Sequence, residues 1–292
     1  MNVKSDFNEF DVVFCGISKN CIKNINKNLK FLDNFSKNSR FNSYVILVDS
    51  DSIDGSKECI QKYIKKNPSF LFRDLDGLED KFSNRIQRIQ ISRNKCLELI
   101  PKLTESSNFI YIPLDLDIDL FKFISINEFE KLIVYCISKN GPNAVFPFSY
   151  PYYYDIFALR SHNWVNTNSL FWVSKFKKYL KIGSFFYNYF FIFRHQITAS
   201  KFDTKKNIKI RSAFGGIGIY KIEKKLPKYE LSIKNPTKVS EHLKFNFHFE
   251  KLEILPTWKI PAPEEHLEFK LLNFKSKLKY FFKTIFFDFV KK

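Results

Sequence analysis

The sequence predicts an α/β fold with a central, mostly parallel sheet and helices on both of its faces. Short apolar runs typical of buried strands alternate with segments whose apolar residues recur every three or four positions, as in helices. This alternation favours a parallel sheet, because each helix carries the chain back to the same edge. The chain has 292 residues, 45% of them hydrophobic. This is enough apolar surface for a substantial core and excludes a disordered chain.

The elements of the first half follow one another in a regular order. Strands are expected at 11–15, 44–48, 70–72 and 109–112, and helices at 21–35, 57–66 and 85–103. The second half is less regular. It contains an aromatic stretch at 146–164, a glycine-rich turn at 214–218 and a proline-rich break at 256–263. After that break, residues 267–292 predict a separate amphipathic helix at the C-terminal end.

Two acidic clusters, at 49–54 and 115–119, follow predicted strands directly. Ligands of parallel α/β sheets bind beyond the carboxyl ends of the strands, so these clusters are candidate site residues. Asp115 and Asp117 are two positions apart, which lets both carboxylates face one cleft. Two carboxylates with few other ligands suit Mg²⁺ or Mn²⁺. The alternative is a solvated acidic turn.

The net charge of +18 favours an anionic partner. Much of this charge lies in two phenylalanine-rich segments, 169–194 and 267–292. A basic amphipathic helix is expected at an anionic membrane surface, although a terminal helix docked on the protein's own core has the same pattern. Five cysteines without a CxxC pair indicate free thiols in a reducing compartment. With no membrane-spanning run and no signal peptide, we expect a cytoplasmic protein, peripheral to the membrane.

Several motifs together resemble one family of enzymes. The run Val45-Ile-Leu-Val-Asp49-Ser-Asp-Ser-Ile-Asp-Gly-Ser56, the pair Arg93-Asn94 and the strand into Asp115-Leu-Asp117 are similar to nucleotide-sugar glycosyltransferases of the GT-A type, with a family 2 pattern. The runs at 153–160, 212–220 and 240–242 look like the bacterial and viral glycosyltransferases related to the cryptococcal capsule mannosyltransferases. The motifs span about residues 11–245.

The resemblance implies a GT-A domain over 1–260, with a nucleotide-sugar-binding half at 1–120 and an acceptor half at 121–260, followed by a basic tail at 261–292. Arginines near the donor suit its phosphate oxygens, and carboxylates suit its base and ribose. Surface charge is the alternative for Arg85 and Arg88, and a tight turn is the alternative for the two glycines. The implied donor-binding residues are Gly16, Asp49, Ser52, Asp54, Arg85, Arg88, Arg93, Asp115, Gly215 and Gly216.

The resemblance also implies a metal centre and a catalytic base. Mn²⁺ or Mg²⁺ would be bound by Asp115, Asp117 and His242, although Ile118 and Asp119 stand where many relatives have Gly and Asn. Asp119 is then a third ligand or a turn residue. Glu241 or Asp155 would act as general base in an inverting enzyme, whereas a retaining enzyme needs none. The implied acceptor-binding residues are Tyr154, Arg160 and Trp164.

The sequence thus predicts a peripheral, metal-dependent glycosyltransferase that moves a hexose from a nucleotide diphosphate sugar to a glycan or lipid-linked acceptor. One alternative is a basic nucleic-acid-binding protein, but the basic residues concentrate in phenylalanine-rich segments and no nucleic-acid module is recognised. Another is an inactive membrane-binding scaffold with the same fold. The intact acidic residues argue against that loss of activity.

Overall fold

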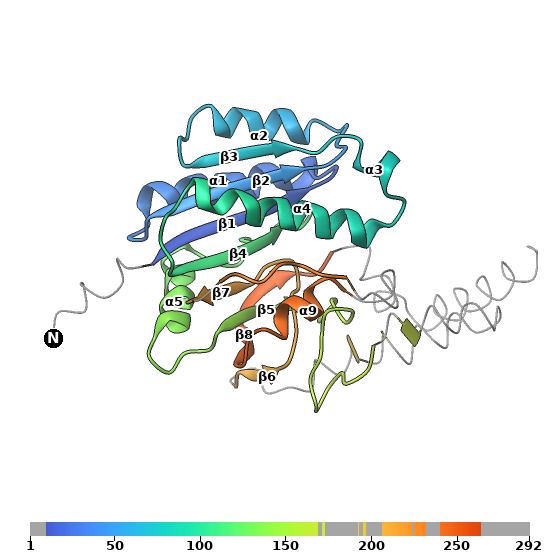
Figure 1. Ribbon diagram of the computed structural model, residues 1–292. Coiled ribbons are helices and arrows are strands. Elements are labelled where there is room, and N and C mark those ends of the chain that lie inside the picture. Colours follow the sequence, from blue (N-terminus) through green and yellow to red (C-terminus); the bar gives the residue numbers. More distant parts are fainter. Residues whose placement is uncertain are drawn as a thin grey trace, which may run out of the picture.

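The computed structural model describes residues 10–168, 171–172, 192, 195–196, 206–223, 225–231 and 240–263. Within these ranges the chain forms one eight-stranded sheet with helices on both faces (Figure 1). The predicted α/β fold is confirmed. The predicted C-terminal helix at 267–292 and most of the basic segment at 169–194 lie outside the described residues.

The sheet has a parallel half and a mixed half. Its strand order is β3-β2-β1-β4-β7-β5-β8-β6. The pairs β2–β3, β1–β2, β1–β4 and β5–β8 are parallel, whereas β7 runs antiparallel between β4 and β5, and β6 runs antiparallel to β8. The strands are β1 (Asp11–Ser18), β2 (Ser43–Asp49), β3 (Phe70–Asp74), β4 (Phe109–Asp115), β5 (Ala144–Tyr150), β6 (Ile208–Ile210), β7 (Ile219–Ile222) and β8 (Leu252–Pro261).

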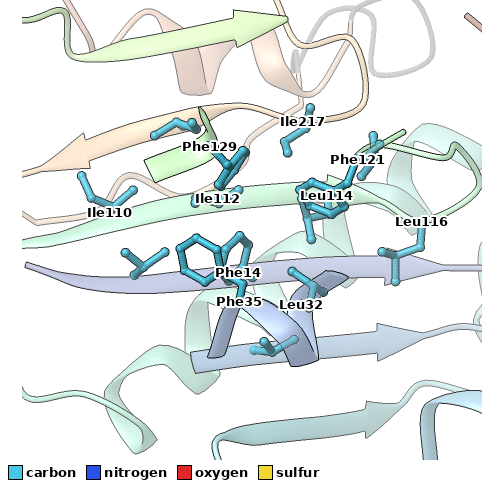
Figure 2. Packing of buried hydrophobic residues seen from close by; sticks show 14 of the residues in the cluster. Phe14, Leu32, Phe35, Ile110, Ile112, Leu114, Leu116, Phe121, Phe129 and Ile217 are labelled. Atoms are coloured by element: carbon cyan, nitrogen blue, oxygen red, sulfur yellow. The ribbon is translucent and has the colours of Figure 1, made fainter. Parts of the chain in front are cut away.

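The described helices divide between the two faces of the sheet. Successive side chains of a strand point to opposite faces. Accordingly, Phe14 of β1 packs in the cluster shared with α1, α2 and α5, which Figure 2 shows, while Cys15 packs with α4 and α9 on the other face. The helices are α1 (Ile22–Asn38), α2 (Ser56–Ile64), α3 (Leu78–Lys81), α4 (Arg85–Leu99), α5 (Ile126–Ile137) and α9 (His242–Asn246), with a 3-10 turn at Ile100–Lys102.

The register of the parallel strands brings polar residues together at one edge. Ser18 at the end of β1 is opposite Asp49 at the end of β2, and Asp49 is opposite Asp74 at the end of β3. On the other side of β1, Ile17 is opposite Asp115, the last residue of β4. The carboxyl edge of the sheet is therefore lined by carboxylates from neighbouring strands, as the two acidic clusters predict.

The predicted break at 256–263 is wrong, because β8 continues through it to Pro261. The register between β5 and β8 shifts there: Leu255 is opposite Pro147, whereas Lys259 is opposite the next residue, Phe148. The extra residues of β8 form a bulge, which accommodates Pro256 because residues in a bulge need not donate to the ladder. Proline in this segment thus bends a strand and does not end it.

Within the part of the chain that the structure describes, no helix is long and apolar enough to cross a membrane.

Candidate active site at the carboxyl edge of the sheet

The loop after β2 is held together by Asp49. Its carboxylate is fully buried and accepts hydrogen bonds from Ser18 Oγ at 2.5 Å, from Ser52 Oγ at 2.7 Å and from the Ser52 backbone N–H at 3.2 Å. Burial raises the pKa of Asp49, and the bonds from Ser18 and Ser52 oppose that rise. The structure places the Asp49 side chain inside the loop and away from solvent, where its hydrogen bonds fix the loop.

The same loop is tied to the N-terminus of α1. The Asp54 carboxylate accepts from the Ile22 backbone N–H at 3.0 Å and from Ser56 Oγ at 2.6 Å, while Ser52 Oγ accepts from the Asn20 N–H at 2.7 Å. Burial alone would raise the pKa of Asp54, but the hydrogen bonds from Ser56 and Ile22 lower it. The serine- and aspartate-rich turn of the sequence therefore cross-links two loops at the carboxyl edge.

Gly16 is required by packing within the sheet. A Cβ atom at Gly16 would lie 2.9 Å from both Leu116 Cδ1 and Leu47 Cδ2. Because real Cβ atoms do not approach carbon so closely, a larger residue here would require the Leu47 and Leu116 side chains to shift. The structure thus places Gly16 beneath the site, where it supports the carboxyl edge.

The loop that carries the second acidic cluster alternates between core and surface. Leu116 and Ile118 are buried, whereas Asp115 is partly exposed and Asp117 is exposed. Asn28 of α1 fixes this path, since its amide nitrogen donates to the Ile118 carbonyl at 2.7 Å. The predicted same-side placement of Asp115 and Asp117 is consistent with this alternation.

Asp119 belongs to the turn. Its carboxylate forms an ion pair with Lys27 Nζ of α1 at 3.1 Å, and over the described ranges it does not form a three-residue metal-binding group with Asp115 and Asp117. Of the two roles left open for Asp119, the structure therefore favours the turn residue.

The three arginines of α4 occupy three different environments. Arg85 is exposed. The Arg88 guanidinium donates to the Phe82 carbonyl at 2.7 Å and to Glu79 at 3.2 Å, so it holds the connection from α3 to α4. Arg93 is 2% exposed. The structure thus gives the three arginines different surroundings: one is exposed, one is bonded to the α3–α4 connection and one is buried.

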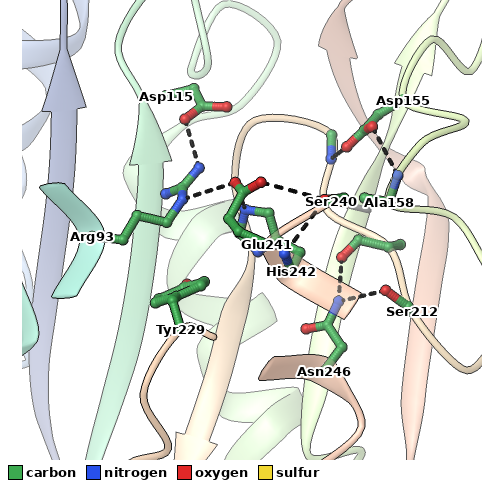
Figure 3. Close-up of polar contacts among 12 residues, drawn as sticks. Arg93, Asp115, Asp155, Ala158, Ser212, Tyr229, Ser240, Glu241, His242 and Asn246 are labelled. Carbon is green, nitrogen blue, oxygen red and sulfur yellow. Dashed lines mark hydrogen bonds and ion pairs between the residues drawn. The ribbon is translucent and has the colours of Figure 1, made fainter. Parts of the chain in front are cut away.

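Arg93 joins the two halves of the chain (Figure 3). Its Nη2 donates to Asp115 Oδ1 at 2.7 Å and its Nε to Glu241 Oε1 at 3.3 Å. Its guanidinium carbon lies 4.6 Å from the centre of the Phe214 ring and 5.6 Å from that of Tyr229. Burial alone would lower the pKa of Arg93, but the charges of Asp115 and Glu241 raise it. Arg93 therefore stays charged and bridges two carboxylates.

Glu241 sits at the start of α9 and is 8% exposed. Burial raises its pKa; Arg93 opposes the rise, and the charges of Asp115 and Asp155 add to it. Its Oε1 lies 3.3 Å from both Arg93 Nε and His242 Nε2, while Oε2 accepts a long hydrogen bond of 3.5 Å from Ser240 Oγ. Oε1 of Glu241 is thus held by the ion pair with Arg93, whereas Oε2 accepts only one long hydrogen bond.

His242 is packed among aromatic rings. Its ring stacks on Phe214 at 3.7 Å between centroids and meets Tyr229 edge-on at 5.4 Å. Among the described residues, neither ring nitrogen has a hydrogen-bond partner. Burial and the charge of Arg93 lower the pKa of His242 well below its usual value, so the ring is neutral. Over the described ranges, no three His, Cys, Asp or Glu side chains form a group able to hold a metal ion, so Asp115, Asp117 and His242 are not gathered in this arrangement.

The glycine turn closes the site from the second half. The Gly215 N–H donates to Asp155 Oδ2 at 3.0 Å, and the Gly216 carbonyl accepts from the Asp115 N–H at 2.8 Å. Both glycines have positive φ, +72° and +91°. A Cβ atom on Gly216 would lie 3.0 Å from Ile118 Cδ1 and 3.2 Å from the Tyr154 hydroxyl. The positive φ angles and the close contacts therefore show that Gly215 and Gly216 form a tight turn in this fold.

Asp155 and Tyr154 lie on the loop that faces this turn. Asp155 Oδ1 accepts from the Ala158 N–H at 3.2 Å. Tyr154 is partly exposed. Burial raises its pKa, and the charges of Asp155, Asp115 and Asp117 raise it further. The Tyr154 hydroxyl lies beside Gly216 of the glycine turn.

The other two predicted acceptor residues are buried. The Arg160 Nη1 donates to the Phe157 and Leu159 carbonyls at 3.2 and 2.5 Å, and burial lowers the pKa of Arg160 to about 10 although Asp155 opposes this. Trp164 is 7% exposed and donates through Nε1 to the His195 carbonyl at 2.8 Å. Its indole packs edge-on against Tyr153, with 4.9 Å between ring centroids, and has little surface left to stack on a sugar.

Two residues near the site carry no motif and were not predicted. The backbone of Tyr229 is clamped by α4, because its carbonyl accepts from Gln90 and Asn94 at 2.9 Å and its N–H donates to Asn94 Oδ1 at 2.9 Å. Asn246 of α9 is fully buried and donates to Ser212 Oγ and the Ala213 carbonyl. Neither residue had a signal in the sequence, since one asparagine in a five-residue helix and a single tyrosine in a loop have no pattern.

No family model and no curated protein matches this chain. Similar solved structures include the mannosyltransferase PcManGT from Pyrobaculum calidifontis in complex with GDP-Man and Mn²⁺, at 15% identity and a TM-score of 0.34 over 48% of this chain and 36% of that one. S. aureus TarS 1-349 is similar at 13% identity and a TM-score of 0.44, over 86% of this chain and 59% of that one. Mannosyl-3-phosphoglycerate synthase from Rubrobacter xylanophilus is similar at 10% identity and a TM-score of 0.39, over 97% of this chain and 73% of that one.

The chain thus spans about a third of the length of PcManGT and under two thirds of TarS 1-349.

Proposed function

We propose that this chain is a metal-dependent glycosyltransferase of the GT-A type that transfers a hexose from a nucleotide diphosphate sugar to a glycan or lipid-linked acceptor. One observation carries the proposal: Asp115 and Glu241, from the two halves of the chain, share the buried Arg93 at the carboxyl edge of a parallel sheet. This edge is where open α/β sheets bind ligands. Asp117, two residues after Asp115, adds an exposed carboxylate.

Asp115 and Asp117 fit a divalent cation through their donor chemistry. Both are carboxylates at a strand end, and Mg²⁺ and Mn²⁺ commonly take one or two protein carboxylates and complete their shell with phosphate oxygens and water. Bound there, the cation would hold the donor diphosphate and neutralise the charge that develops as it leaves. His242 is left out of this proposed ligand set, because its buried ring packs on Phe214.

Glu241 is the proposed general base. Ionised Glu241 would accept the proton of an acceptor hydroxyl while the acceptor oxygen forms a bond to the anomeric carbon of the sugar. The bond from that carbon to the diphosphate breaks, the nucleoside diphosphate leaves with the electron pair, and the configuration inverts. Asp155 is the weaker candidate, since each of its oxygens accepts a backbone N–H from the turns around it.

The loops around these carboxylates supply the remaining proposed contacts. The cross-linked 49–56 loop supports a site for the nucleoside, with Ser52 and Asp54 at its edge and Asp49 as its internal brace. Tyr154, partly exposed and beside the glycine turn, is the proposed acceptor contact. Arg160 would act on the acceptor side through its charge near Asp155.

The proposal predicts slow hydrolysis of a nucleotide sugar in the absence of acceptor. The full chain would be incubated with UDP-, GDP- and dTDP-hexoses and Mn²⁺, and the released nucleoside diphosphate would be measured. Turnover of at least one donor is expected, because water can replace the acceptor hydroxyl at the base. No release from any donor would contradict the proposal.

We further propose that the acceptor is met at an anionic membrane surface. This rests on the sequence of the basic, phenylalanine-rich segments 169–194 and 267–292. Such segments bind anionic lipid through burial of apolar side chains and attraction of lysines. Liposome flotation tests it: the full chain is expected to float with vesicles that contain phosphatidylserine and not with neutral vesicles, and removal of 267–292 is expected to weaken flotation. Equal flotation without the tail would refute its anchor role.

A further inference from the structure

The Arg93 side chain is buried among the residues that it contacts. It is among the largest fully buried side chains of the described residues. Nη2 and Nε each bond a carboxylate, on Asp115 and Glu241, and the guanidinium lies beside the rings of Phe214 and Tyr229. Its third nitrogen, Nη1, is also buried, with no hydrogen-bond partner among the described residues. Two of the three guanidinium nitrogens are thus bonded to carboxylates inside the protein.

We propose that Arg93 is a positioning residue that fixes Asp115 and Glu241 relative to one another and that it is not a ligand of the donor diphosphate. The inference rests on the proposed function, in which Asp115 belongs to the donor side and Glu241 is the base. Arginine suits the task, since its planar fork presents several donors at fixed angles, which the single ammonium of lysine does not.

The surroundings of Arg93 resist its movement. Helix α4 fixes Tyr229 through Gln90 and Asn94, and the Tyr229 hydroxyl lies 3.2 Å from that of Tyr111 in β4. Phe214 lies directly before the glycine turn that binds the Asp115 backbone through Gly216. The glycine turn beside the guanidinium therefore also holds the backbone of Asp115. A residue in this place can fix the positions of its carboxylate partners.

The test separates positioning from diphosphate binding through two measured quantities. Wild type is compared with Arg93→Lys and Arg93→Met. The kcat is measured by hydrolysis of the donor that wild type turns over. The Kd for UDP and GDP is measured by calorimetry in the presence of Mn²⁺. Arg93→Met is expected to lower kcat by about 10²-fold or more, whereas nucleotide Kd, which senses only the released Asp115, rises less than about tenfold; Arg93→Lys is expected to recover part of kcat. Lys95→Met, the same change on the surface of α4 where Lys95 pairs with Glu98, is the control.

A second pair of variants guards against misfolding of Arg93→Met, which leaves Glu241 buried without its cation. Glu241→Gln is compared with Glu241→Gln combined with Arg93→Met, which removes cation and carboxylate together. Because only the contact with Asp115 is then left to lose, Arg93→Met is expected to lower kcat by a smaller factor in the Glu241→Gln background than in wild type.

Three outcomes overturn the inference. If Arg93→Met raises the nucleotide Kd about tenfold or more and retains kcat, Arg93 is a diphosphate ligand; if Arg93→Met has wild-type kcat per folded molecule, its role is structural alone. Fully additive losses of kcat in the double variant would also overturn it. Failure of the proposed function is recognised separately, because wild type then hydrolyses no donor; the inference falls with it.

Discussion

Glu241→Gln is expected to lower kcat by about 10²–10⁴-fold, the usual contribution of a general base. Glutamine keeps the size of the side chain and can still accept from Arg93 Nε, so the fold and the affinity for the nucleotide should remain close to wild type. The loss should appear in kcat, measured by hydrolysis of the donor at saturating concentration. Unchanged kcat would exclude Glu241 as the base and return Asp155 to that role.

The pH dependence of the wild-type rate gives an independent check on the same residue. The pKa of Glu241 is raised above its ordinary value of 4.5 by burial and by the charges of Asp115 and Asp155. A base works when ionised, so the rate should be full above the raised pKa and fall as the pH drops through it. The acid limb of kcat/KM should therefore lie at a higher pH than an ordinary glutamate gives, and it should vanish in Glu241→Gln.

Glu98→Gln is the matched control for Glu241→Gln. Glu98 is an exposed glutamate that pairs with Lys95 at 2.7 Å on α4, and its change to glutamine removes the same charge away from the site. Its kcat and pH profile should equal those of wild type. An equal loss in both variants would indicate a general effect of charge on the enzyme.

Asp117→Asn is expected to abolish metal-dependent binding of the nucleotide. A ligand at 100 times its Kd stabilises the folded state by about 2.7 kcal/mol, which raises the melting temperature of wild type measurably. UDP or GDP with Mn²⁺ should raise the melting temperature of wild type and not that of Asp117→Asn. Since the Asp117 side chain is exposed, the melting temperature without ligand should hardly change.

Asp119→Asn is the control for Asp117→Asn, because Asp119 lies two residues further on the same loop and pairs with Lys27. It should retain the stabilisation by nucleotide and Mn²⁺. A full rise in melting temperature with nucleotide and Mn²⁺ in Asp117→Asn would contradict the assignment of the cation to Asp115 and Asp117. Loss of that rise in Asp119→Asn alone would contradict it as well.

The parallel half of the fold could be predicted because its residues carry local patterns. Asp11–Cys15, Tyr44–Val48 and Phe109–Ile112 were recognised as buried runs, and each strand continues a few residues further to the polar end that forms the carboxyl edge. The mixed half could not be ordered from the sequence. Strand β7 pairs with β4 and β5 over long separations, and β8 absorbs Pro256 in a bulge, which no local rule anticipates.

The candidate site was predicted by residue type more than by role. Asp115, Glu241 and Arg93 do lie together, whereas the resemblance implied that Arg93 binds the donor diphosphate. The positioning role that we propose instead rests on the burial of Arg93 against Phe214 and Tyr229, which are distant from it in the chain. His242 likewise has the chemistry of a metal ligand, but aromatic packing encloses it.

Hydrolysis of a donor panel with and without Mn²⁺ is the measurement that tests the central claim most directly. The full chain is predicted to release the nucleoside diphosphate from at least one nucleotide hexose, to lose this turnover when the divalent cation is chelated, and to regain it when Mn²⁺ is restored. Absence of turnover across UDP-, GDP- and dTDP-hexoses, with the chain folded and Mn²⁺ present, would contradict the account.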